Sequence, residues 1–371
     1  MQPSTQSSIV NPLPGLPLWT IAAPIFAGAV LLAGGVGLGH ALGAMFVALI
    51  AAGLAGSVFA AVHHAEVIAH RVGEPYGTLV LALAVTLIEV ALIVSLMIAG
   101  GAEAAALARD TVFAAVMIIL NGIIGLCLTV GGAMHREQSF SLDGVSAALV
   151  ALGAIVVMTL VFPNYTITTP GPFYSPSQLL LIAIVSIVIY AAFIFTQTIG
   201  HRQFFLQDED GSEAHAQHPG NRATALSAAL LLLSLVAVVL LAKKLAPSLE
   251  SAVLRLGAPN AVVGVIIAGI ILLPEGLAAL RAARANRLQI SLNLALGSAL
   301  ASIGLTIPAV SFLALYMHTQ LLLGIDAKSS VLLMLSLFVT ALALRTGRTI
   351  ILYGVVLLVV FALYLFTTVV P

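Results

Sequence analysis

Long apolar segments follow one another along almost the whole chain, and they constrain its fold more than any other feature. A helix of about 20 apolar residues is long enough to cross the hydrocarbon of a bilayer. By that measure the sequence predicts an all-α integral membrane protein with about eleven transmembrane helices. We place them near residues 18–38, 43–62, 77–100, 111–132, 145–162, 179–199, 225–245, 259–280, 288–314, 329–344 and 349–370.

Composition supports a bilayer as the solvent of this chain. Hydrophobic residues make up 61% and charged residues only 8%, whereas soluble domains carry about 25% charged residues. The formal net charge is zero, with 14 basic and 14 acidic residues, so no nucleic-acid partner is indicated. The single cysteine, Cys127, excludes an internal disulfide. The first 17 residues contain no Lys or Arg, so we expect the first apolar segment to be a retained anchor rather than a cleaved signal peptide.

One long polar segment, residues 201–223, divides the spans into six before it and five after it. Two consecutive units of five helices must insert with opposite orientation, because five is odd. Inverted repeats are a transporter architecture, with the ion site at their interface near the middle of the membrane. We therefore predict an N-terminal tail and extra helix (1–42), a first five-helix repeat (43–199), an acidic linker (200–224) and a second five-helix repeat (225–371).

The distribution of basic residues predicts the orientation. With the N-terminus in the cytoplasm, nine Lys and Arg residues fall in inside loops and five in outside loops. Cytoplasmic loops carry an excess of these residues, so we expect a cytoplasmic N-terminus. The linker, with Asp208, Glu209, Asp210 and Glu213, is then cytoplasmic too.

Two glutamates lie inside apolar segments at matching places of the two predicted repeats. Glu89 is in the second helix of the first repeat, and Glu275 is in the second helix of the second repeat. Placing an acid at the centre of a membrane helix costs at least about 2.5 kcal/mol. Burial favours the protonated form of a carboxyl group, whereas a bound cation favours the ionised form. Such a carboxylate can exchange a cation for protons at one site.

The helix that follows each glutamate carries further polar residues. These are Asn121 in the first repeat, and Asn293, Ser298 and Ser302 in the second. Amides and hydroxyls supply neutral oxygen ligands for a hard cation. They also join membrane helices or permit close packing, so both interpretations stay open. Pro274, directly before Glu275, is expected to interrupt its helix and free carbonyl groups.

The segment HHAEVIAH, residues 63–70, places His63, Glu66 and His70 on one face of a helix. One interpretation is a proton pathway or gate at the cytoplasmic mouth of the third span, and another is a solvated helix end. A third treats the three residues as ligands of a membrane-embedded metal-dependent hydrolase. No HExxH motif is present, and the hydrolase hypothesis leaves the matched glutamates unexplained. A passive channel is a further alternative.

Two segments resemble the signature regions of calcium/proton exchangers in the calcium/cation antiporter superfamily. They are EVIAHRVGEPYGTLVLALAVTLIE (66–89) and LPEGLAALRAARANRLQISLNLALGSALASIGLTIP (273–308). The segment HHAEVIAHRVGEPYGTL (63–79) is similar to the corresponding sequence of bacterial ChaA-type cation/proton antiporters. The resemblance implies eleven spans with an acidic cytoplasmic linker, which agrees with the count above, and a location in the bacterial inner membrane.

The same resemblance implies roles for individual residues. In the family, the acids that match Glu89 and Glu275 bind the cation and carry protons, and the polar residues that match Asn121, Ser298 and Ser302 line the site. Many members carry a Gly-Asn dipeptide shortly before each acid, whereas this chain has VTLIE (85–89) and ILLPE (271–275). Besides the two glutamates, Thr86 has the only side-chain oxygen in these two stretches. Sodium and potassium therefore stand beside calcium as candidate ions.

The resulting hypothesis is a secondary active antiporter and not an enzyme. It exchanges cytoplasmic cations for protons at a mid-membrane site that is built on two glutamates. Its expected partners are inorganic cations, protons and the lipid bilayer. No cofactor is expected besides the transported calcium, sodium or potassium ion.

Overall fold

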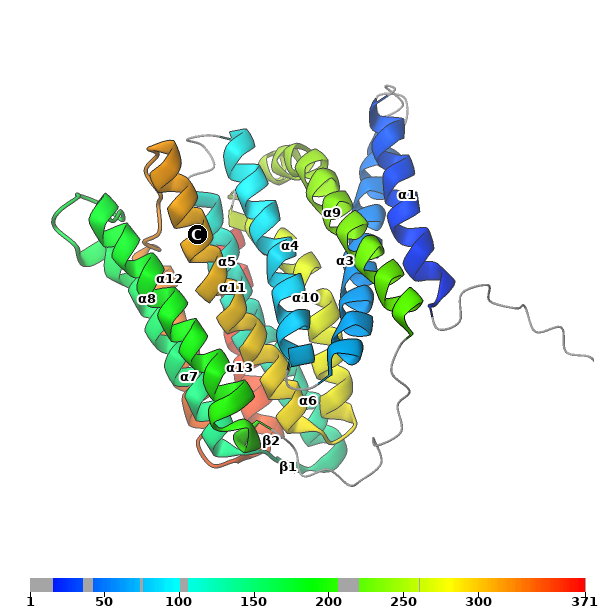
Figure 1. Ribbon diagram of the computed structural model, residues 1–371. Coiled ribbons are helices and arrows are strands. Elements are labelled where there is room, and N and C mark those ends of the chain that lie inside the picture. Colours follow the sequence, from blue (N-terminus) through cyan, green and yellow to red (C-terminus); the bar gives the residue numbers. More distant parts are fainter. Residues whose placement is uncertain are drawn as a thin grey trace, which may run out of the picture.

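The computed structural model describes residues 16–35, 43–73, 76–100, 106–205, 220–259 and 261–370. These residues form a bundle of long helices (Figure 1). The part before the linker contains α1 (Leu18–Gly35), α3 (Ala44–Val72), α4 (Tyr76–Gly100), α5 (Leu107–Met117), η2 (Ile118–Ile123), α6 (Ile124–His135), β1 (Glu137–Ser139), α7 (Leu142–Val156), η3 (Val157–Val161), η4 (Phe162–Tyr165), α8 (Pro176–Phe195), η5 (Thr196–Gly200) and η6 (Arg202–Phe204). The part after it contains α9 (Asn221–Arg255), α10 (Ala261–Arg284), α11 (Leu288–Met317), α12 (Ala327–Leu344), β2 (Arg348–Ile350) and α13 (Ile351–Val369).

The predicted all-α membrane fold is confirmed. Within the described ranges, ten helices are long and apolar enough to cross a membrane. The eleventh predicted span is α4, in which residues Ala82–Ser95 form the apolar part. The elements α5, η2 and α6 are one continuous span, because the π-helical turn η2 interrupts the α-helical pattern without ending the helix.

One extra helix and two sets of five spans build the bundle. The first set is α3, α4, α5–η2–α6, α7 and α8, and the second is α9 to α13. Their leading helices, α3 and α9, pack along each other and run in opposite directions, with α1 against both (Figure 1). This is the inverted arrangement expected for an odd number of spans. The residue limits proposed for the repeats stay a prediction, and the linker's four acids lie outside the described residues.

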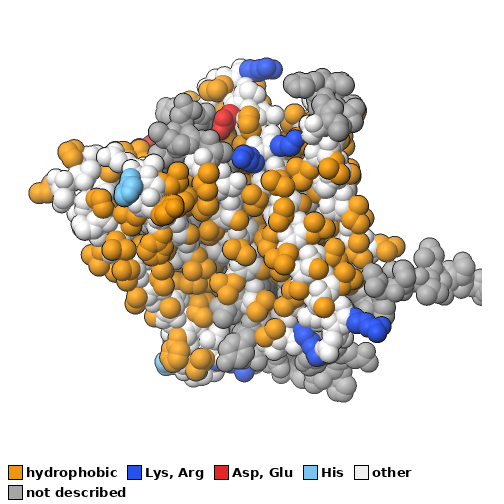
Figure 2. Space-filling model, turned by 45° about the horizontal axis from the view of Figure 1, so that its top comes forward, with side chains coloured by type: hydrophobic (Ala, Val, Ile, Leu, Met, Phe, Trp, Pro, Cys, Tyr) orange, Lys and Arg blue, Asp and Glu red, His pale blue; other side chains and the backbone are white. Residues whose placement is uncertain are grey.

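The surface has the pattern expected of a membrane protein. Figure 2 shows hydrophobic side chains over the middle of the visible face, with most Lys and Arg side chains near its two ends. Exposed apolar residues such as Leu32, Val150 and Leu232 would be costly in water. In a bilayer these apolar side chains contact lipid hydrocarbon, which is also apolar. The chain is therefore a multi-pass membrane protein.

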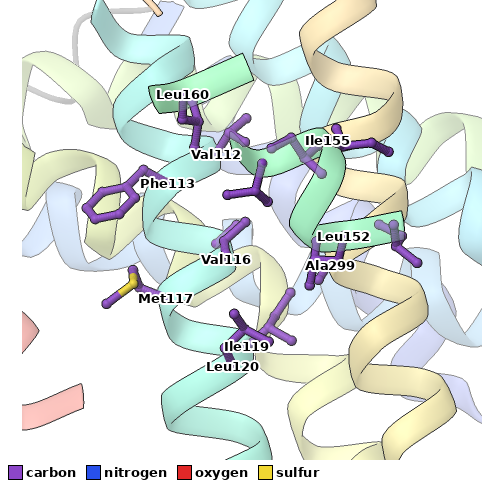
Figure 3. Close-up of a cluster of buried hydrophobic side chains, with 14 of the residues drawn as sticks. Val112, Phe113, Val116, Met117, Ile119, Leu120, Leu152, Ile155, Leu160 and Ala299 are labelled. Carbon is purple, nitrogen blue, oxygen red and sulfur yellow. The ribbon is translucent and has the colours of Figure 1, made fainter. Parts of the chain in front are cut away.

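The span Leu107–His135 is the most buried of the ten: 78% of an 18-residue apolar stretch within it is buried, against 22% for α1. Side chains of α5 and η2, among them Val116 and Leu120, pack against Leu152 and Ile155 of α7 and Ala299 of α11 (Figure 3). A second apolar cluster joins α1, α3 and α9 to faces of α4 and α10. The span that carries Asn121 is therefore central, and the extra helix is peripheral.

Two local features differ from the sequence prediction. The helix α3 continues ten residues beyond the predicted end at 62 and stops at Gly73, whose φ of 78° favours glycine. The segment HHAEVIAH thus forms the last turns of the second span rather than the mouth of the third. The strands β1 and β2 pair antiparallel and connect the two halves, with Gln138 of β1 paired to Thr349. Strands of three residues are too short to produce a readable alternation.

The helices α6 and α13, one from each half, approach closely through glycines. A Cβ atom added to Gly354 would lie 2.6 Å from the carbonyl oxygen of Gly125 and closer still to Thr129. Small residues allow membrane helices to come this near, which increases their van der Waals contact. This contact fixes α13 against the central span.

We predict that Gly354→Ala destabilises the protein by about 1–3 kcal/mol, because the added methyl group overpacks the α6–α13 contact. Gly153→Ala is the matched control, since a Cβ at Gly153 would meet no atom within 4 Å. The measurement is the thermal unfolding midpoint of both purified variants in detergent. Equal midpoints for Gly354→Ala and the wild type would contradict the packing argument.

Candidate ion-binding site

Glu89 of α4 and Ser302 of α11 meet in the interior. The Ser302 hydroxyl donates a hydrogen bond of 2.5 Å to Oε1 of Glu89. Glu89 is 4% exposed and Ser302 is 1% exposed. The two residues come from opposite halves of the chain, so this contact crosses the interface between the repeats. A hydroxyl that donates to a carboxylate stabilises its ionised form.

Glu275 of α10 belongs to the same neighbourhood. Its Oε2 atom is buried and has no hydrogen-bond partner among the described residues. The carboxyl groups of Glu89 and Glu275 lie close enough to interact electrostatically. The two acids, at matching places of the two halves, thus lie within electrostatic range of each other, and neither has a Lys or Arg partner among the described ion pairs.

These polar residues lie at the middle of their helices. Glu89 is the fourteenth of the 25 residues of α4, and Glu275 is the fifteenth of the 24 residues of α10. Ser302 is the fifteenth of the 30 residues of α11. Asn121 is the fifteenth of the 29 residues of its span. Midway positions in membrane-spanning helices place these side chains at the depth where an ionised carboxylate is most costly.

Pro274 does not interrupt its helix, so that expectation is wrong. Helix α10 is continuous from Ala261 to Arg284. Proline lacks the N–H that would bond the carbonyl group four residues earlier, which is that of Ile270. Because Pro274 is buried in a tightly packed bundle, neighbouring helices hold α10 together, and one backbone carbonyl rather than a broken turn is left without its helical donor.

Asn121 lies in the π-helical turn η2 and is fully buried. Its amide nitrogen donates to Oγ of Ser336 at 2.8 Å and to the carbonyl oxygen of Met117 at 3.3 Å. Its Oδ1 is buried without a hydrogen-bond partner in the described part of the chain. A side chain at Gly276, next to Glu275, would meet Ile123 of η2 at 3.2 Å, so this turn packs beside the second acid. π-Helical turns are frequent at functional sites.

Thr86 and Ser298 lie within one turn of the Glu89–Ser302 pair. Thr86 precedes Glu89 by three residues and donates its hydroxyl hydrogen to the carbonyl oxygen of Ala82 at 2.9 Å. Its oxygen keeps lone pairs for another ligand. Ser298 precedes Ser302 by four residues on α11 and is partly buried. Both residues therefore stay candidates for lining the site.

Asn293 lies away from the Glu89–Ser302 pair. It precedes Ser302 by nine residues on α11, which is about 13.5 Å along a helix. Its amide nitrogen donates to the carbonyl oxygen of Phe205 at 2.6 Å, and its Oδ1 accepts from Gln289 at 2.9 Å. The side chain thus fastens the end of the α8 region to α11. The sequence could not distinguish this role, since Asn293 lies in the same apolar helix as Ser298 and Ser302.

The residues His63, Glu66 and His70 stay on one face of α3. Nδ1 of His63 is 4.0 Å from Oε2 of Glu66, and the His63 ring lies against Trp19 of α1. His70 and Arg281 of α10 act electrostatically on Glu66. The described residues contain no group of three His, Cys, Asp or Glu side chains that could hold a metal ion, so the hydrolase hypothesis finds no site there.

Two buried residues were missed by the sequence analysis. Ser336 of α12 contacts Asn121, as described above, and His64 connects α3 to two neighbours. Nδ1 of His64 lies 3.3 Å from Oγ of Ser227, and its Nε2 lies 3.2 Å from the carbonyl oxygen of Thr20. Serines are common in apolar helices, so the sequence did not single out Ser336. The sequence also does not distinguish His64 from the adjacent His63, and only the fold shows which histidine is buried between helices.

Comparisons with known proteins identify transporters that are similar to this chain in sequence or fold. The family model described as "Sodium/calcium exchanger protein" matches residues 40–199 and 226–370. A protein of Sinorhizobium fredii named as an ionic transporter, y4hA, is 49% identical over 96% of this chain and 97% of its own length. The sodium-potassium/proton antiporter ChaA of Escherichia coli is 38% identical over 85% of this chain and 86% of its own. The crystal structure of the H+/Ca2+ exchanger CAX has a TM-score of 0.69 at 14% identity, covering 94% and 88% of the two chains.

We predict that Ser302→Ala weakens cation binding about tenfold or more, because the lost hydrogen bond to a charged group is worth about 1.5–3 kcal/mol. Asn293→Ala should leave binding within about twofold of the wild type, since its amide is engaged elsewhere. Calorimetric titration of each purified variant with Ca2+, Na+ and K+ measures both effects. A larger loss for Asn293→Ala than for Ser302→Ala would show that the site lies elsewhere on α11.

Proposed function

The chain belongs to the sodium/calcium exchanger protein family, as its resemblance to calcium/cation antiporters predicted, and we propose that it exchanges cytoplasmic cations for protons at Glu89 and Glu275. An exchanger-type antiporter is a transporter and not an enzyme, which leaves the hydrolase alternative without support. Calcium, sodium and potassium are the candidate ions. The observation that carries this proposal is a pair of mid-helix acids, one in each half: Ser302 of the second half donates to Glu89 of the first, and Glu275 has a buried oxygen without a hydrogen-bond partner among the described residues.

The proposed mechanism follows from the buried Glu89 side chain and the buried Oε2 atom of Glu275. Away from water, a carboxylate needs a neutralising partner, either a proton or a cation. The described ion pairs give neither glutamate a basic partner. A cation that enters displaces protons, and protons that enter displace the cation. Alternating access of one site to the two sides of the membrane then couples the two fluxes, without a separate coupling device.

The number of acids limits the stoichiometry. Two carboxyl groups hold at most two protons in place of one cation. A two-for-one exchange against calcium is electroneutral, whereas a two-for-one exchange against sodium or potassium moves one net charge. The membrane potential contributes about 2.3 kcal/mol per charge per 100 mV to the second exchange only. Each pH unit contributes about 1.4 kcal/mol per proton to both.

The neutral ligands proposed for the cation are few. They are Thr86, Ser298 and Ser302 near Glu89, and Asn121 near Glu275, whereas Asn293 is engaged with Phe205. Calcium takes six to eight oxygen ligands. A site with so few neutral oxygen ligands is not expected to select calcium strictly over sodium or potassium. The relatives' names also point to more than one ion: ChaA is named for sodium and potassium, and CAX for calcium.

We assign the face of His63, Glu66 and His70 to the proton pathway or gate. These side chains lie on the last turns of α3, at the same end of the bundle as the end of α10, whose Arg281 acts on Glu66. A titratable carboxyl group between α3 and α10 at this end can pass protons towards Glu275. With the predicted positive-inside orientation, this end faces the cytoplasm and the N-terminus is cytoplasmic too. The membrane is proposed to be a bacterial inner membrane.

We predict that Glu89→Gln and Glu275→Gln each abolish exchange, because glutamine keeps the shape and hydrogen bonding of the side chain but cannot exchange a proton for a cation. The measurement uses inverted vesicles with a preset pH gradient, to which Ca2+, Na+ or K+ is added separately while the collapse of the gradient is followed.

Glu250→Gln on α9 is the control, since Glu250 is an exposed acid and should tolerate the change. The amount of each variant in the membrane is checked by immunoblot. Near wild-type exchange by both single glutamine variants would refute the two-glutamate site. Cation flux without any movement of protons would instead identify a passive channel.

A further inference from the structure

Ser336 of α12 is a buried hydroxyl that the proposed mechanism does not yet use. It is 0% exposed and is the tenth of the 18 residues of α12, again at the middle of a helix. Its oxygen accepts the 2.8 Å hydrogen bond from Nδ2 of Asn121. This contact joins the fourth helix of the second half to the π-helical turn of the first half.

The hydroxyl hydrogen of Ser336 is already committed. Ser336 donates to the carbonyl oxygen of Leu332, one turn earlier on α12, at 2.7 Å. Towards Asn121 the serine oxygen therefore presents lone pairs. The carbonyl oxygen of Met117, 3.3 Å from the same amide nitrogen, is also only an acceptor. Asn121 thus faces two acceptors on one side.

Two acceptors determine which way the amide group points. In the observed orientation both hydrogens of Nδ2 are used, one by Ser336 and one by Met117. The flipped orientation would place Oδ1 against two oxygen lone pairs and would leave Nδ2 without these acceptors. Ser336 and Met117 therefore turn Oδ1 away from α12. That oxygen is buried and has no partner among the described residues, and an acceptor without a donor is a ligand for a cation.

We propose that Ser336 is a positioning residue that orients Asn121, so that its carbonyl oxygen faces the transported cation. The inference rests on the proposed two-glutamate site. It is supported by the packing of Ile123 against Gly276, which brings η2 beside Glu275. The two-fold relation supports it as well: Ser302, on the third span of the second half, meets Glu89, so Asn121, on the third span of the first half, is expected beside Glu275.

The alternative role for the Asn121–Ser336 contact is structural, as a bond that holds two helices together. The two roles predict different changes. Loss of a structural bond lowers the thermal unfolding midpoint and leaves the KM of the folded protein unchanged. Loss of a positioning bond lets the amide rotate, so the cation loses a fixed ligand and its KM rises while the maximal rate is retained.

The test measures KM and maximal rate for Ca2+, Na+ and K+ in vesicles that contain Ser336→Ala, Ser336→Thr or the control Ser311→Ala. Ser311 is also fully buried, but lies nine residues from Ser302 on α11. For each ion that drives exchange, Ser336→Ala should raise KM about tenfold, as expected for loss of one well-placed ligand, with the maximal rate within about twofold. Ser336→Thr keeps the hydroxyl and should restore the wild-type KM, and Ser311→Ala should not change it.

A wild-type KM for Ser336→Ala, with or without a lower unfolding midpoint, would overturn the proposal. Equal defects in the Ala and Thr variants would also overturn it, because packing would then explain both. If Ser336→Ala fails to insert, Ser336→Cys replaces it: the thiol fills the space but accepts hydrogen bonds weakly, so KM should still rise. A wild-type KM for Ser336→Cys would count against the proposal in the same way.

The outcome is separable from that of the proposed function. If Glu89→Gln and Glu275→Gln abolish exchange while Ser336→Ala keeps the wild-type KM, only the positioning role fails. If the glutamine variants exchange normally, the two-glutamate site itself fails. The variant Asn121→Ala gives a further check by calorimetric cation titration, because adding Ser336→Ala to it should cause no further loss of affinity.

Discussion

The free-energy cost of an ionised carboxylate away from water is the constraint on which the rest of this structure depends. Glu89 is buried between α4 and α11 with one hydrogen bond from Ser302, and Glu275 has a buried oxygen without any partner in the described chain. A protein that only needed stability would place apolar residues there. Retaining two acids without basic partners leaves their neutralisation to protons or cations, which is the basis of the proposed exchange.

The architecture provides what these two acids need. Two sets of five helices with opposite orientation bring Glu89 of α4 and Glu275 of α10 within electrostatic range of each other, although 185 residues separate them in the sequence. The central span contributes the π-helical turn with Asn121, and α11 contributes Ser302. Glycines between α6 and α13 hold the central span in place. Each polar side chain of the site is thus supported by a packed helix rather than by a loop.

Much of the fold and the two key acids could be predicted from the sequence, because both depend on simple physical signals. Apolar segments of bilayer length reveal the spans, and an acid such as Glu275 stands out in them because it is costly there. Pro274 was misjudged, since packing by neighbouring helices outweighs one missing hydrogen bond. Asn293 and Ser336 were not separable from other polar residues of apolar helices, since their roles depend on which helix packs beside them. Strands of three residues, such as β1, are too short for a pattern.

In the proposed mechanism, the cation and protons compete for the same two carboxyl groups. The most direct test of this competition is to count the protons released when the purified wild-type protein binds Ca2+ in weakly buffered detergent solution, with Na+ and K+ measured in the same way. Binding that releases protons, up to about two per ion and fewer as the pH rises, is the predicted result, because metal binding to carboxylates displaces their protons. Saturable binding with no proton release at any pH between about 6 and 9, the range in which buried glutamates are known to titrate, would contradict it.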